Sequence, residues 1–147
     1  MSCSYTLPKL VELNAASRIL RERRRLLVAS RCLECEHPEV LKPFLDRYAV
    51  ATACLEEEHV NVLGFKLLGI LGRVELEEVV VLTVDGSMHC VQLHFMVEEI
   101  FKLLQPRARR RHLVSVRGRI VEVGQRAVKI ARYLSRSENM LSRAATG

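Results

Sequence analysis

The sequence predicts an α/β fold, a small layered domain whose mixed sheet contains a central parallel β-α-β-α unit and a C-terminal hairpin. One observation is the run VVVLTV at 79–84, which is followed by a polar turn and by helical spacing over 89–104. Another is a similar strand-then-helix succession over 48–71. The third is a pair of short β-rich runs, HLVSV and RIVEV, joined by Arg-Gly at 117–118. Together these patterns indicate strands alternating with helices, followed by two adjacent strands.

The stretch from 79 to 104 carries the strongest signal. Residues 79–84 include four valines and a threonine, and β-branched residues favour a buried strand. Asp85-Gly86 is typical of a turn and ends that strand. Apolar residues then recur with the spacing of one helix face, at Cys90, Leu93, Val97, Ile100, Phe101 and Leu104.

A second strand–helix unit precedes this one. Residues 48–54 predict a strand, and 57–71 predict a helix whose first-turn glutamates complement the helix dipole. Two such units in succession require a right-handed crossover, which makes their strands parallel. Cys54 and Asp85 should therefore emerge at the same edge of the sheet, the edge at which open α/β sheets bind ligands.

The flanking segments complete a single domain over 1–147. The spacing predicts an amphipathic helix over 8–30 and a short helix over 38–46 that begins at a proline. A basic hairpin with a further helix is expected over 107–136, and a frayed tail over 137–147.

Composition narrows the class of protein. At 147 residues the chain is long enough to bury a core, and 27% charged residues is ordinary for a globular protein. Because no long uncharged stretch and no signal peptide are visible, we expect a cytoplasmic protein without a membrane span. Arginine outnumbers lysine 18 to 5, which leans towards a thermophilic source.

Charge is distributed unevenly. Residues 55–105 have a net charge of −6, whereas 107–136 carry 10 basic side chains and one acidic one. This asymmetry predicts self-association as a homo-oligomer or binding to an acidic protein partner, although charge runs are often only a solvated surface. Nucleic-acid binding through the arginines is an alternative, ranked lower because aromatic residues make up only 5% of the chain and no DNA- or RNA-binding motif is present.

The expected edge carries residues that could perform thiol chemistry. Cys90 lies in the first turn of the helix predicted over 89–104, where the helix dipole favours the thiolate. His94, four residues later, shares its face and could act as a base, with Asp85 as an orienting carboxylate. These three residues are the candidate catalytic set, although no known catalytic signature is matched and no reaction can be assigned.

A metal site is a second interpretation of the same edge. Thiolates and imidazoles suit zinc, and the candidate ligands are Cys54, His59, Cys90 and His94. Cys32 and Cys35 form a CxxC pair that could join them, less readily, and would then permit an iron–sulfur cluster.

Two further interpretations stay open. Gly86, Ser87 and His89 could bind a small anionic ligand, such as a phosphate or carboxylate, at the start of the helix. Alternatively, the cysteines and His94 could simply pack in the core, because free cysteine is among the most buried residue types.

Overall fold

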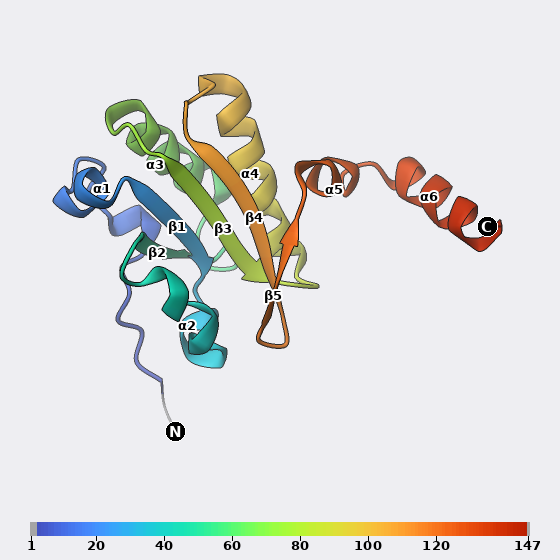
Figure 1. Ribbon diagram of the computed structural model, residues 1–147, viewed down its shortest axis with the longest axis horizontal. Coiled ribbons are helices and arrows are strands. Elements are labelled where there is room, and N and C mark those ends of the chain that lie inside the picture. Colours follow the sequence, from blue (N-terminus) through green and yellow to red (C-terminus); the bar gives the residue numbers. More distant parts are fainter. Residues whose placement is uncertain (1–2, 147) are drawn as a thin grey trace.

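A five-stranded mixed sheet forms the centre of the molecule, which we describe over residues 3–146 from a computed structural model (Figure 1). The strand order is β2-β1-β3-β4-β5. Four strands run parallel, and the last is antiparallel to its neighbour: β1 (Arg25–Ser30), β2 (Ala49–Ala53), β3 (Glu78–Val84), β4 (Arg109–Val116) and β5 (Arg119–Val123). The predicted fold class is confirmed, with one strand more than the sequence suggested.

The additional strand is β1, which lies inside the segment predicted as a helix. The prediction of one helix over 8–30 is wrong, because a 3-10 helix (Leu10–Glu12) and α1 (Arg18–Arg23) precede the strand. Arg24 ends α1 in the left-handed conformation with φ of 56°, which a right-handed helix cannot continue through. The strand begins at Arg25, and the residues after it, LLVAS, are buried on both faces of the sheet, which suits a continuous apolar strand.

Helices cover both faces of the sheet. α3 (Val60–Arg73) and α4 (Met88–Leu104) pack on one face, close to the helices predicted over 57–71 and 89–104. The other face is covered by α2 (Leu33–Glu36) and by short 3-10 helices. The helix predicted over 38–46 is in fact two such 3-10 segments, Pro38–Val40 and Lys42–Phe44.

The strands β2 and β3 are parallel, as the sequence predicts, but they are not neighbours. β1 lies between them and pairs with both. Its last residue, Ser30, is level with Ala53 at the end of β2, and Ala29 is level with Leu82 of β3. The carboxyl ends of three parallel strands therefore lie side by side.

The C-terminal part begins with the predicted hairpin. Arg117 and Gly118 both have positive φ, as a two-residue hairpin turn requires. Beyond β5 come α5 (Gln125–Ile130) and α6 (Leu134–Thr146), which extend away from the sheet (Figure 1). The frayed tail predicted over 137–147 is wrong for residues 137–146, which are helical, and Gly147 lies outside the described residues.

The basic stretch before the hairpin forms the start of β4. Arg111 pairs with Glu78 at 3.4 Å and with Glu122 at 2.9 Å, and Arg110 pairs with Glu98. Several of these arginines therefore neutralise carboxylates of the sheet and of α4. No helix within residues 3–146 is long and apolar enough to cross a membrane.

We predict that Gly118→Ala destabilises the fold by about 1–3 kcal/mol, the range for one strained backbone position. Gly118 has φ of +84°, and a Cβ there would lie 2.8 Å from Oε1 of Glu39 and 2.9 Å from Nδ1 of His37. Urea unfolding measures the effect. Gly124→Ala is the control, because its φ is −72° and nothing lies within 4 Å. Equal losses in both variants would contradict the argument.

Candidate functional site

The candidate site lies at the carboxyl edge of β1, β2 and β3. The chain passes from β1 to β2 on one side and then crosses to β3 on the other, so the strand order reverses beside β1. Ligands of open α/β sheets bind in the crevice at such a reversal. The loops that follow these strands carry Cys32, Cys54 and the turn 85–87.

Three free thiols come together at this edge: Cys32, Cys54 and Cys90, each half-buried. Burial, and next the negative charges of Glu36, Cys90 and Cys54, together raise the pKa of Cys32 to about 11. Cys32 thus lies close enough to Cys54 and to Cys90 for their charges to act on it. The sequence predicted that Cys54 and Cys90 lie at this edge, and it named Cys32 as a less favoured candidate ligand there.

Cys90 is held by two serines. Its Sγ lies 3.2 Å from the Oγ of Ser30, the last residue of β1, and its backbone N–H donates to the Oγ of Ser87 at 3.3 Å. Ser87 is the N-cap of α4, so its side chain satisfies part of the helix end itself. The contact between Ser30 and Cys90 joins the β1 edge to the start of α4.

The turn residues have identifiable structural roles. The backbone N–H of Asp85 donates to the carbonyl of Ser115 at 3.1 Å, and Gly86 adopts φ of 89°. His89 lies 3.4 Å from Glu56, which links α4 to the loop after β2. His59 is exposed immediately before α3, and its imidazole makes no hydrogen bond or ion pair with any residue in 3–146.

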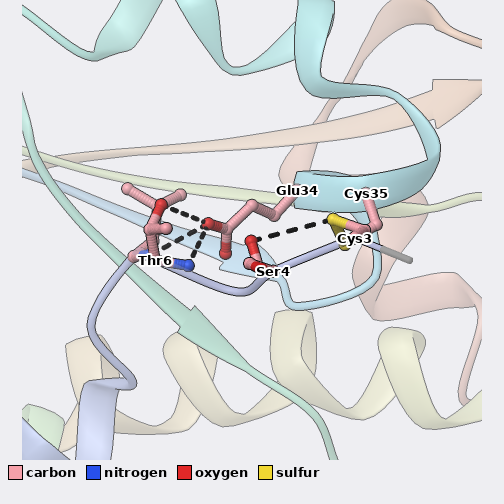
Figure 2. The surroundings of a disulfide bond; sticks show 6 residues. Cys3, Ser4, Thr6, Glu34 and Cys35 are labelled. Atoms are coloured by element: carbon pink, nitrogen blue, oxygen red, sulfur yellow. Dashed lines mark hydrogen bonds between the residues drawn. A yellow bond between two sulfur atoms is a disulfide. The ribbon is translucent and has the colours of Figure 1, made fainter. Parts of the chain in front are cut away.

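The two cysteines of the CxxC pair are in different states. Cys35 forms a disulfide with Cys3, whereas Cys32 stays free (Figure 2). Beside the disulfide, Oε1 of Glu34 accepts hydrogen bonds from the backbone of Thr6 at 2.6 Å and from its hydroxyl at 2.8 Å. Burial would raise the pKa of Glu34, but these bonds lower it. The N-terminal segment is thus fastened to α2, and Cys35 cannot serve as a ligand.

The arrangement does not favour a metal centre. Among residues 3–146, no group of three or more histidine, cysteine, aspartate or glutamate side chains is placed to hold a metal ion. The geometry therefore gives no support to the zinc site expected from Cys54, His59, Cys90 and His94. The same holds for the iron–sulfur cluster that Cys32 and Cys35 would have joined.

His94 faces the core between α4 and the sheet. It is 5% exposed, and both of its ring nitrogens have partners. Its Nε2 lies 2.7 Å from the hydroxyl of Thr83, and its Nδ1 lies 2.9 Å from Nδ1 of His112. Both ring nitrogens of His94 are therefore engaged with residues other than Cys90, and its role as a base for that thiol stays a prediction.

The donors and acceptors in this buried series of hydrogen bonds can be assigned in order, starting from Glu98. His112 Nε2 lies 3.0 Å from the carboxylate of Glu98, which can only accept, so His112 donates from Nε2. In the neutral form of His112, its Nδ1 then accepts from His94, and His94 accepts from the hydroxyl of Thr83. Burial, and next the positive charge that His112 carries when it is protonated, lower the pKa of His94 to about 4, so the His94 imidazole is neutral at pH 7.

The partners His112 and Glu98 were missed by sequence reasoning. His112 was seen only as part of a basic run, and nothing in its spacing links it to His94. Their meeting depends on β4 lying beside β3 under α4. Of these two residues, only Glu98 could have been placed near His94 from the sequence, because it follows His94 at helical spacing.

We predict that stability falls as pH drops from about 6.5 towards 4, because the unfolded chain then binds a proton that folded His94 does not. The loss should approach roughly 3 kcal/mol at the acid end. Urea unfolding at several pH values measures it, and NMR titration of the His94 ring reports its pKa directly. His94→Gln should flatten this dependence, whereas His59→Gln should not. A His94 pKa near 6.5 would contradict the assignment.

Comparison with known proteins gives a family. Residues 17–146 match a family model described as a Rossmann-like domain. No curated protein and no solved structure matches the chain significantly. The match spans most of the sequence, and the alternating strands and helices of β1 to β4 agree with it. The chain belongs to the Rossmann-like domain family.

Proposed function

We propose that the protein binds a small ligand at the carboxyl edge of β1, β2 and β3, in contact with Cys32, Cys54 and Cys90. The observation that carries the proposal is the meeting of three free thiols, delivered by separate segments, beside the point where the strand order reverses. Packing alone explains one buried cysteine readily, but it does not explain three half-buried thiols at the edge where this fold binds ligands.

The charges around the edge favour a neutral or cationic ligand. Glu36, Glu56 and Asp85 are exposed there, and Arg31 is already paired with Glu57. These carboxylates disfavour the small anionic ligand expected from the sequence. The first turn of α4 is also capped by its own Ser87, which removes one donor from an anion.

The mode of binding should differ from that of a dinucleotide. The loop after β1 reads SRCLEC and contains none of the glycines that allow a backbone to approach a pyrophosphate. With its pKa near 11, Cys32 stays a thiol at neutral pH and is a poor nucleophile. We therefore propose polarisable, weakly hydrogen-bonding contacts from the thiols and assign no reaction.

The test is NMR mapping with a library of neutral, cationic and anionic fragments. We predict that binding fragments shift the amide signals of residues 30–33, 54–57 and 85–91, and that neutral and cationic members predominate. Cys90→Ala should weaken the tightest fragment about tenfold, the effect of losing one contact worth about 1.4 kcal/mol.

The control variant is Met88→Ala, in the same turn of α4, because Met88 is 79% exposed. It should leave fragment binding unchanged. Fragments that bind elsewhere on the molecule, or that bind equally well to Cys90→Ala, would contradict the proposed site.

Metal analysis by mass spectrometry, with a count of free thiols, separates this proposal from the metal interpretation. We expect three titratable thiols in the unreduced denatured protein, because Cys3 and Cys35 are paired. Near-stoichiometric zinc or iron in protein purified without an affinity tag would replace the small-ligand proposal with a metal site.

A further inference from the structure

The last two helices form an arm, which we define as residues 125–146. Val128 of α5 is buried, and α5 contacts α4 of the body. α6 contacts α5 and continues beyond it, away from the sheet (Figure 1). None of the side chains described in α6 is buried. Isolated helices shorter than about 12–15 residues are marginal in water, and α6 has 13 residues. Contacts outside this chain would therefore add much to its stability.

A cleft of about 470 Å³ lies between α5 and α6. Four cationic side chains line it: Arg126, Lys129, Arg136 and Arg143. No carboxylate lines the cleft, and none of the four makes an ion pair with a carboxylate in residues 3–146. The arginines of β4 differ in this respect, because they pair with glutamates of the body. The cleft thus concentrates positive charge that no carboxylate of residues 3–146 pairs with.

Apolar side chains accompany this charge. Ile130 and Met140 line the cleft between the cations, and Met140 is 56% exposed. Leu134 and Leu141 lie one heptad apart on α6 and are 83% and 67% exposed. A ligand that carried only charged groups would leave these apolar side chains exposed to water.

We propose that this cleft is the docking site for an acidic, amphipathic segment of a partner protein. Glutamates or aspartates of the segment pair with the four cations, and its apolar side chains cover Ile130 and Met140. The positive charge of the cleft requires an acidic partner. Its apolar lining requires that the partner segment also carries hydrophobic side chains between its acidic residues. This docking site is separate from the thiol edge and does not depend on it.

Other polyanions fit the cleft less well. Stacking of nucleic-acid bases needs exposed aromatic rings, and the arm has a single one, Tyr133, which is 40% exposed and has the guanidinium group of Arg136 4.4 Å from its ring centroid. A flat membrane surface would not fill a concave cleft whose cations converge from two helices. Both polyanions are included as alternatives in the test.

The experiment measures fluorescence anisotropy with a labelled peptide in which leucine recurs every three or four residues and glutamate fills the other positions. We expect saturable binding to the full chain that weakens as salt rises. A peptide with glutamine in place of every glutamate should bind at least about tenfold more weakly. Slower deuterium exchange of the α6 amides in the presence of the acidic peptide should locate the contact.

Matched charge variants locate the site by a second route. The double variant Arg136→Gln/Arg143→Gln should bind the acidic peptide about tenfold more weakly, because each exposed charge pair contributes modestly. Arg21→Gln/Arg47→Gln removes two exposed, unpaired cations of the body and should leave binding unchanged.

Three results would overturn the proposal. One is no binding of the acidic peptide to the wild-type chain, and another is an equal loss in both double variants. The third is tighter binding of labelled single-stranded or duplex DNA, or of phosphatidylglycerol vesicles, that depends on Arg136 and Arg143.

Discussion

The burial of β1 between β2 and β3 is the constraint on which the rest of the structure depends. Leu26, Leu27 and Val28 are completely buried, and each such side chain contributes roughly 1.5–3 kcal/mol. Because β1 pairs with both neighbours in register, its loop emerges between theirs. That placement brings Cys32 to Cys54 and Cys90, and it brings Ser30 against the Cys90 thiol. Without β1 in the centre, the thiol edge would not exist.

The sequence was informative wherever periodicity and turn chemistry agreed. The units over 48–71 and 79–104, the Asp85-Gly86 turn and the hairpin were all predictable from local patterns. β1 was not, because its buried run does not alternate and no glycine or proline separates it from α1. The break occurs at Arg24, whose left-handed backbone conformation is unusual for a residue with a side chain and leaves no trace in the sequence.

The site was predictable only in part, for a different reason. Parallel strands place Cys54 and Cys90 at one edge by topology alone, whereas cysteine pairing follows from the tertiary fold. The CxxC spacing suggested that Cys32 and Cys35 act together, but Cys35 is bonded to Cys3 across a separation of 32 residues. Likewise, helical spacing put His94 near Cys90, while its hydrogen-bond partners are Thr83 of β3 and His112 of β4.

Counting charged residues in the sequence does not show which arginines are paired with carboxylates in the fold. The net charge over 107–136 counts every arginine equally, but arginines of β4 form ion pairs with Glu78, Glu98 and Glu122. Glu78 is 3% exposed, so its carboxylate requires such partners to remain buried. Arg110 also donates to the side chain of Gln125, the first residue of the arm, at 2.9 Å. Paired charge therefore reaches into the arm at Arg132, which lies 3.2 Å from Glu99. The four cations of the cleft make no ion pair with a carboxylate in residues 3–146, so they are available to another molecule.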